Sequence, residues 1–176
     1  MADRDEALPE LLDETLAPVA GPLGERVCEL IREGLRRAKR IDCWDFVPSN
    51  YEVVHSVLAG LASDARASGR RLRFCEWGSG IGIVTAMAAT LGFEARGIEI
   101  DERLVAAARD LLGEFGIVAT LDVGDYLELP HGADVYFTYC WPSQIGPLER
   151  HFTRTAPPDA RLLICYGAED VRCKRR

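Results

Sequence analysis

Apolar positions follow two different periods along the chain. In the first 71 residues they recur three and four apart, which predicts a weak helix over residues 8–16 and stronger helices over 25–40 and 51–65. Ser49 or Asn50 can cap the last of these helices. Residues 1–71 are therefore expected to form a helical N-terminal cover.

Beyond residue 71, short apolar runs alternate with helical patterns. The expected strands are 72–76, 95–100, 117–121, 134–139 and 161–166, and the expected helices are 83–91, 102–115 and 145–155. This alternation is typical of a parallel sheet with helices on both faces. We expect an α/β, doubly wound, Rossmann-like core over residues 72–176, which joins the N-terminal cover in one compact domain.

The end of the chain shapes the expected edge of the sheet. Ten residues follow Tyr166, and the last of them are mostly basic, which indicates a solvated tail. The sheet is then expected to stop at its fifth strand. A homodimer or a partner would cover that open edge, because exposed strand edges are usually protected.

Charge and length restrict the function further. The 176 residues carry a net charge of −7, which disfavours binding to duplex nucleic acid through phosphate contacts. No apolar run approaches the ~20 residues that span a bilayer, and the acidic start does not resemble a signal peptide. The six cysteines form no CxxC pair, so we expect reduced thiols, no metal site and a cytoplasmic protein.

A glycine-rich turn joins the first expected strand to the next helix. Residues 76–82 read EWGSGIG, with glycines at alternate positions and an acid two residues before the first. Such a turn allows unusual backbone angles and close approach of a ligand. A dinucleotide fingerprint would need a third glycine at position 83, which is Ile83.

Two more acids follow the next two strands. Glu99 ends the second strand, and Asp125 follows the third in the sequence Val-Gly-Asp. Together with the turn, this pattern resembles the class I S-adenosylmethionine-dependent methyltransferases. The resemblance implies the strand order 3-2-1-4-5, although the antiparallel pair that usually finishes the family's sheet is expected to be absent. Acids also suit a cofactor that carries a sulfonium cation and no phosphate.

The resemblance assigns roles to several residues. An acid at the position of Glu99 holds the cofactor ribose through strong hydrogen bonds to both hydroxyls. An acid at Asp125 accepts from the adenine amino group, and Tyr126 flanks the ring. The expected cofactor-binding residues are Glu76, Gly78, Ser79, Gly80, Gly82, Glu99, Ile100, Asp125, Tyr126 and Tyr139.

The segment after the fourth strand reads Tyr-Cys-Trp-Pro over residues 139–142. In the family this place faces the transferable methyl group, and members that methylate amino groups carry Asp or Asn there. Its absence argues against methylation of adenine or glutamine nitrogen. Tyr139, Trp141 and Pro142 are candidates for the substrate pocket, because aromatic faces stabilise cations. The alternative is that these aromatics only pack in the core and the turn.

An upstream segment is the candidate lid. Phe46, Ser49 and Tyr51 lie where many relatives fold over the methionine end of the cofactor. The alternative is an ordinary helix entrance.

The sequence therefore predicts a methyltransferase that acts by positioning and desolvation on an unidentified small-molecule or protein acceptor. No proton-transfer residue is assigned. The alternatives are a non-catalytic S-adenosylmethionine-binding subunit that needs a partner, or an aminopropyltransferase-like enzyme.

Overall fold

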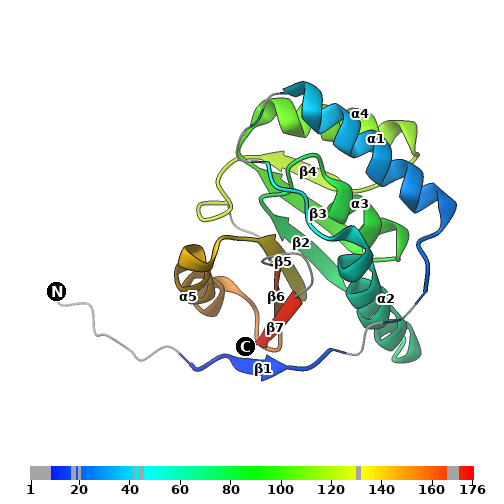
Figure 1. Cartoon of the computed structure of the whole chain (residues 1–176). Coiled ribbons are helices and arrows are strands. Elements are labelled where there is room, and N and C mark those ends of the chain that lie inside the picture. Colours follow the sequence, from blue (N-terminus) through cyan, green and yellow to red (C-terminus); the bar gives the residue numbers. More distant parts are fainter. Residues whose placement is uncertain are drawn as a thin grey trace.

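Strands with apolar residues on both faces form the centre of the molecule. The computed structural model describes residues 9–16, 19, 21–41, 43, 46–129, 132–165 and 171–176. In the described residues the strands are β1 (Leu12–Glu14), β2 (Arg73–Trp77), β3 (Glu94–Glu99), β4 (Thr120–Val123), β5 (Val135–Tyr139), β6 (Arg161–Cys165) and β7 (Val171–Arg175). They build one seven-stranded sheet in the order β1-β7-β6-β5-β2-β3-β4 (Figure 1).

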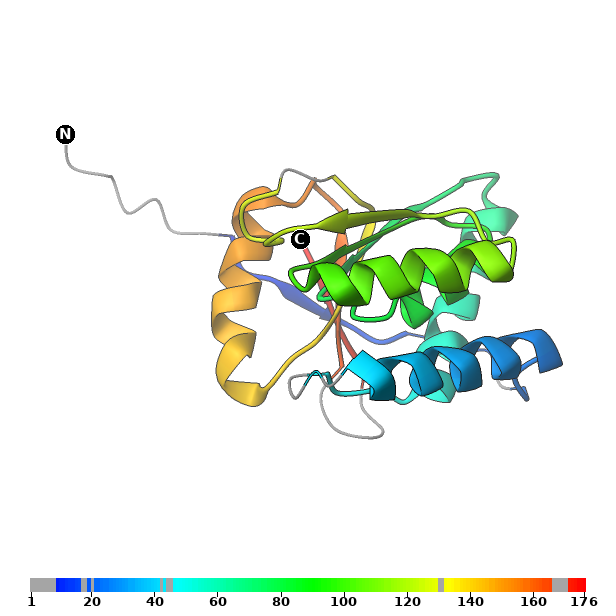
Figure 2. The ribbon, with the colours of Figure 1, turned by 90° about the horizontal axis from the view of Figure 1, so that it is seen from above.

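The helices cover both faces of this sheet. They are α1 (Glu25–Ile41), α2 (Tyr51–Ala67), α3 (Ile83–Thr90), α4 (Glu102–Glu114) and α5 (Ile145–Thr155). Helices α2, α3 and α4 pack on one side, and α1 lies outside α3 and α4. Helix α5 packs on the other side, as the view from above shows (Figure 2).

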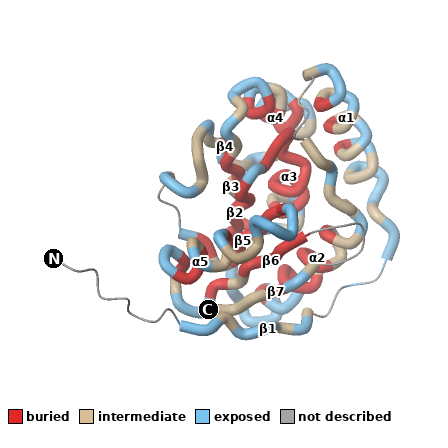
Figure 3. Tube along the Cα trace, turned by 60° about the vertical axis from the view of Figure 1, so that its left-hand side comes forward, coloured by how far each residue is buried: buried red, intermediate tan, exposed pale blue. Residues whose placement is uncertain are grey.

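Alternation along β2 explains how one strand serves two cores. Phe74 faces the α2–α4 side, whereas Cys75 and Trp77 belong to the cluster under α5. Each of the three is 1% exposed. Figure 3 shows the buried residues concentrated in the central strands and α3, with exposed residues along β1 and the outer helices. This double burial requires a strand that is apolar on both faces.

The five expected strands correspond to β2 to β6, and neighbouring strands among them pair in parallel. The third lies later than expected: β4 begins at Thr120, and Val118, assigned to the strand by its apolar character, is 92% exposed. Among the described residues, no helix is both long and apolar enough to cross a membrane.

Three expectations about the two ends of the chain are wrong. The sheet does not stop at β6, because β7 pairs antiparallel with it and β1 pairs antiparallel with β7. An antiparallel pair is therefore present, although one of its strands comes from the N-terminal region. Residues 12–14 form this strand rather than part of a helix. Tyr166, the expected end of the fifth strand, lies outside the described residues.

Charge pairing explains why the basic segment becomes a strand instead of a solvated tail. Lys174 in β7 bonds Asp13 in β1 at 2.7 Å, and Arg161 in β6 holds Glu14 with two hydrogen bonds of 2.8 and 2.9 Å. Cys173 faces inward and is 3% exposed. The acids of β1 thus compensate the cations of the strands beside them, and β7 pairs with the edge of β6 within the chain.

The Arg161–Glu14 pair should measurably stabilise this end of the sheet. We expect Arg161→Met to lower the free energy of unfolding by about 1–2 kcal/mol, because it leaves a partly buried carboxylate without its two charged donors. Urea denaturation measures the change. The control is Arg175→Met, which breaks a pair with Asp159, a side chain 77% exposed, and should cost less than about 0.5 kcal/mol. Equal losses in the two variants would contradict this account.

Candidate functional site

A cavity of about 550 Å³ opens at the carboxyl ends of β2, β3 and β5. Ligands bind at this edge in open α/β sheets, where crossovers to opposite faces leave a crevice. Twelve of the predicted site residues line the cavity: Phe46, Ser49, Tyr51, Glu76, Gly78, Ser79, Gly80, Glu99, Ile100, Tyr126, Tyr139 and Trp141. Gly82, Asp125 and Pro142 are not in the lining.

The turn after β2 is fixed against the end of β3. The backbone amides of Gly78 and Ser79 both donate to the Ile98 carbonyl at 2.9 Å. The Gly80 amide donates to a carboxylate oxygen of Glu99 at 2.8 Å. Gly80 has a φ of +52°, and a Cβ there would lie 2.8 Å from the Phe46 ring. Glycine is therefore required both for the backbone conformation and for the close approach of Phe46.

A second glycine lets β3 pass close to the turn and to α3. A Cβ on Gly97 would lie 2.7 Å from Ser79 Cβ and 2.7 Å from Thr85 Oγ1. Ser79 itself is 5% exposed, and its hydroxyl has no hydrogen-bond partner among the residues that the structure describes. A buried hydroxyl without a partner is uncommon and costs free energy. Ser79 thus brings an unused polar group to the lining of the cavity.

Glu76 is a buried carboxyl group at the end of β2. It is 5% exposed, and its Oε2 accepts hydrogen bonds from the amide of Thr85, at 2.8 Å, and from the Thr85 hydroxyl. Burial raises the pKa of Glu76 from 4.5 to about 8, and the Glu99 carboxylate nearby adds to the rise, whereas the Thr85 hydrogen bonds oppose it. A cation beside Glu76 would favour its charged form.

Glu99 presents its carboxylate at the end of β3. One oxygen accepts from Gly80, and the other accepts from the amide of Asp101 at 3.0 Å. Two backbone donors therefore fix the orientation of the carboxylate. Each oxygen keeps acceptor capacity for a further donor, since a carboxylate offers about four lone-pair positions. The arrangement suits a ligand that carries two neighbouring hydroxyls.

Of the two adenine-binding residues predicted after β4, Tyr126 lines the cavity and Asp125 does not. Asp125 Oδ1 accepts from the Leu127 amide at 2.8 Å, which makes it a local turn residue in this structure. Tyr126 does reach the cavity, and its ring stacks on Trp77 with centroids 5.3 Å apart and planes 12° apart. Burial raises the pKa of the Tyr126 hydroxyl. Gly82 serves as the N-cap of α3 and lies behind the lining.

The upstream segment folds over the cavity. Phe46 packs on Gly80, and Ser49 and Tyr51 line the same space. The cap of α2 is Asn50, whose side chain accepts from the Val53 amide at 3.3 Å. Ser49 is therefore not needed as the cap. Burial raises the pKa of the Tyr51 hydroxyl, and the proximity of Glu76 adds to the effect.

The segment after β5 supplies the remaining wall. Tyr139 and Trp141 form an edge-to-face pair with centroids 6.4 Å apart. Pro142 begins a short 3₁₀ helix, Pro142–Gln144, outside the lining. Gln144, which is not among the predicted site residues, also lines the cavity and accepts from the Trp141 amide at 3.0 Å. The sequence does contain a signal for this contact: Pro142 follows the N-cap Trp141, and Gln144 stands three residues after Trp141, where a side chain can bond the N-cap amide.

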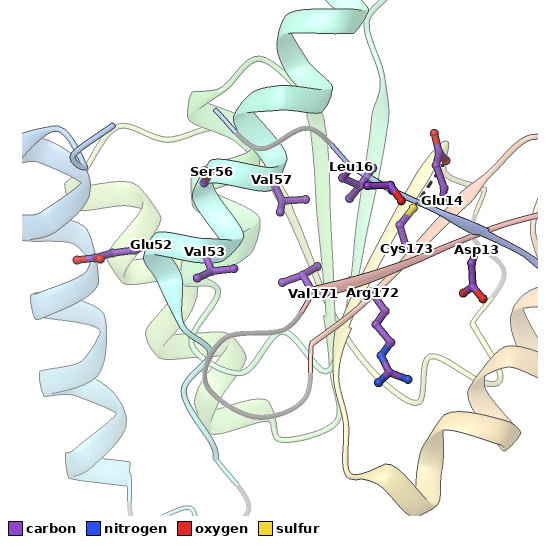
Figure 4. A pocket seen from close by; sticks show the side chains of 11 residues that line it. Asp13, Glu14, Leu16, Glu52, Val53, Ser56, Val57, Val171, Arg172 and Cys173 are labelled. Atoms are coloured by element: carbon purple, nitrogen blue, oxygen red, sulfur yellow. Dashed lines mark hydrogen bonds between the residues drawn. The ribbon is translucent and has the colours of Figure 1, made fainter. Parts of the chain in front are cut away.

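A second cavity, of about 600 Å³, lies between α2 and the strands β1 and β7 (Figure 4). Its walls include Leu16, Val57, Val171 and Cys173. Glu14, also in the lining, accepts from the thiol of Cys173, its partner on the neighbouring strand, at 3.8 Å. None of the predicted site residues belongs to this lining. No group of three or more His, Cys, Asp or Glu in the described ranges is arranged to hold a metal ion.

The raised pKa of Glu76 predicts a pH-dependent stability. Between about pH 4.5 and about pH 8 the unfolded chain has released this proton while the folded chain keeps it, so the free energy of unfolding falls as pH rises. Glu76→Gln keeps an acceptor for Thr85 but does not titrate. We expect its stability relative to the wild type to increase from about pH 5 to about pH 8.5 in urea denaturation. A constant difference would contradict the assignment.

The sequence matches no protein-family model and no curated protein. Solved structures resemble it. An RNA methyltransferase from Salinibacter ruber, solved with S-adenosylhomocysteine, is 25% identical, covers 73% of this chain and 92% of its own, and has a TM-score of 0.60. A methyltransferase from Geobacter sulfurreducens is 17% identical, covers 89% of this chain and 92% of its own, and has a TM-score of 0.62.

A third similar structure binds the methyl donor itself. It is an O-methyltransferase of tomaymycin synthesis from Streptomyces achromogenes in complex with S-adenosylmethionine, 17% identical over 81% of this chain and 66% of its own, with a TM-score of 0.57. The architecture that the glycine turn and the strand pattern led us to expect is thus found in solved methyltransferases. The chain has the fold of the class I S-adenosylmethionine-dependent methyltransferases.

Proposed function

We propose that the protein is a methyltransferase that uses S-adenosylmethionine. The observation that carries this proposal is the fixed arrangement of Glu99 and the glycine turn at the mouth of the cavity. Carboxylate oxygens held by backbone amides match a ribose diol, and the turn lets a ligand approach the backbone closely. The similar structures solved with S-adenosylmethionine or S-adenosylhomocysteine support the same cofactor.

The other residues of the cavity fit this cofactor. Glu76 is a buried acid that a cationic amino acid moiety would hold in its charged form. Ser79 offers a buried hydroxyl that no other described residue bonds. Tyr126 and Ile100 both line the cavity and can contact the adenine ring. Ile100 is 72% exposed, so its side chain is available for such a contact. Asp125 directly precedes Tyr126 and is kept as the candidate acceptor for the adenine amino group.

The residues of the chain act by positioning and by excluding water. Bound S-adenosylmethionine supplies an activated methyl group on a sulfonium sulfur. Glu99 and the turn orient the nucleoside, and Glu76 holds the amino acid end. Phe46 and Tyr51 close over the cavity from the N-terminal segment, so that cover and core complete one site. Holding two reactants in line and out of water accounts for much of the rate of such a transfer.

The pairing of β6 argues against the alternative of a non-catalytic binding subunit that needs a partner. That alternative followed from the expected open edge at the fifth strand. The edge of β6 is instead paired with β7, and β7 with β1. No feature of the described lining favours an aminopropyl transfer. We therefore retain methyl transfer as the proposed activity.

Replacement of Glu99 tests the proposal. We expect Glu99→Ala to weaken binding of S-adenosylhomocysteine by about tenfold to a hundredfold, because hydrogen bonds to a charged acceptor are worth about 1.5–3 kcal/mol. Isothermal titration calorimetry measures the affinities. The matched control is Glu94→Ala at the far end of the same strand, where the side chain is exposed.

A second ligand separates lost ribose contacts from a disturbed turn. The wild type should bind adenosine more tightly than 2′,3′-dideoxyadenosine, and Glu99→Ala should bind the two equally. A preference for adenosine that persists in the variant, or an equal effect of Glu94→Ala, would refute the ribose-binding role.

A further inference from the structure

One wall of the cofactor cavity is an exposed aromatic ring. Trp141 follows β5 and lines the cavity, yet it is 57% exposed. Single exposed apolar side chains are ordinary on protein surfaces. Trp141 also lines the cavity, and an aromatic ring in that position can contact a bound ligand. Tyr139 packs its ring edge-to-face against the indole, with an angle of 84° between the planes.

The backbone under this ring is held in place. The Trp141 amide donates to Gln144 Oε1 at 3.0 Å, and the Gln144 amide donates back to the Trp141 carbonyl at 2.8 Å. Trp141 is thereby the fixed N-cap of the short 3₁₀ helix. A rigid ring of this kind binds a planar group by stacking, at little cost in conformational entropy.

The charged groups of the lining select against an anion. The described residues contribute two carboxyl groups, Glu76 and Glu99, as the charged or chargeable acids beside this wall, together with neutral aromatic rings. An anionic acceptor would face like charge, whereas acids and aromatic faces both stabilise a cation.

Burial favours the protonated form of three further groups in this lining. Burial raises the pKa of the Cys140 thiol to about 11, and it also raises the pKa values of the Tyr51 and Tyr126 hydroxyls. Glu76 lies on β2 with one oxygen bonded to Thr85, and Glu99 is bonded to two backbone amides. The groups around Trp141 are thus arranged for a nucleophile that needs no deprotonation.

We propose that the methyl acceptor is a small, planar, uncharged nitrogen heteroaromatic that stacks on Trp141 and is methylated on a ring nitrogen. This proposal rests on the proposed methyltransferase function and names the substrate class of the same site. The lone pair of the ring nitrogen forms the new bond to the methyl carbon. The bond from that carbon to sulfur breaks, and its electron pair stays on sulfur.

This transfer balances without a base. The positive charge passes from sulfur to the ring nitrogen, and no proton moves. The product is a fixed cation, which the acids and rings of the cavity stabilise. The arrangement of the lining therefore matches the charge change of the reaction as well as the shape of the acceptor.

A matched pair of probes tests the proposal on the full chain. Quinoline-3-carboxamide and quinoline-3-carboxylate share the ring nitrogen and differ in charge. With the protein saturated by S-adenosylhomocysteine, calorimetry should show the carboxamide binding at least about tenfold more tightly than the carboxylate. With S-adenosylmethionine, the carboxamide should yield a product that is one methyl group heavier and carries a positive charge at neutral pH, where the unmethylated quinoline is uncharged.

Variants test the stacking surface. Trp141→Ala should weaken carboxamide binding by about tenfold while changing S-adenosylhomocysteine affinity less than about twofold, since base–aromatic stacking is worth roughly 1–3 kcal/mol. The control is Leu127→Ala, an exposed apolar residue outside the cavity lining, which should change neither affinity.

The outcomes of these experiments distinguish a failure of the proposed acceptor class from a failure of the proposed methyltransferase function. If S-adenosylhomocysteine binds but neither probe does, if the carboxylate binds as well as the carboxamide, or if Trp141→Ala has no effect, the acceptor class is wrong and the methyltransferase function stands. Methylation of an RNA homopolymer but not of the carboxamide would also overturn it. If S-adenosylhomocysteine itself does not bind, both proposals fail.

Discussion

The site depends on the docking of the turn after β2 against the end of β3. Three consecutive amides, those of Gly78, Ser79 and Gly80, donate to the Ile98 carbonyl and the Glu99 carboxylate. The turn can adopt this conformation because glycine tolerates positive φ at Gly80, and it can lie so close because Gly97 has no side chain. The same contacts that close the turn orient the carboxylate, so fold and site share one set of interactions.

Burial of polar groups around this turn gives the site its chemical character. Glu76 has lost most of its contact with water and keeps its proton to an unusually high pH. The Ser79 hydroxyl has no hydrogen-bond partner in the described part of the chain. Both features cost free energy in the folded chain. A bound cation would stabilise the charged form of Glu76, and a hydrogen-bonding ligand would give the Ser79 hydroxyl a partner. Ligand binding would therefore offset the cost of burying these two groups.

Sequence patterns predicted the parts of the structure that depend on local periodicity. The helices after β2, β3 and β5 and the strands β2 and β5 lie close to their expected ranges, and the glycine turn brings Glu76 and Glu99 to one cavity. The failures concern contacts that are distant in sequence. Glu14 and Arg161 are 147 residues apart, so the charge pairing that turns the basic end into β7 has no local signature.

The same limit applies within the site. Asp125 was expected at the cavity from its place after β4, yet its carboxylate caps its own turn through Leu127. Asx turns of this kind compete with ligand contacts and cannot be distinguished from them in a sequence. Gln144 was missed because its role comes from a hydrogen bond to the Trp141 backbone. Strand periodicity thus located the edge of the sheet, whereas side-chain hydrogen bonds decided which residues line the cavity there.

The central claim is that the cavity binds a phosphate-free cationic nucleoside through acids and a glycine turn. Calorimetric titration of the full chain with S-adenosylhomocysteine, and in parallel with NAD, tests it most directly. The account predicts saturable binding of one S-adenosylhomocysteine per chain and no binding of NAD, whose pyrophosphate would face the carboxylate of Glu99. Binding of NAD without binding of S-adenosylhomocysteine would contradict it.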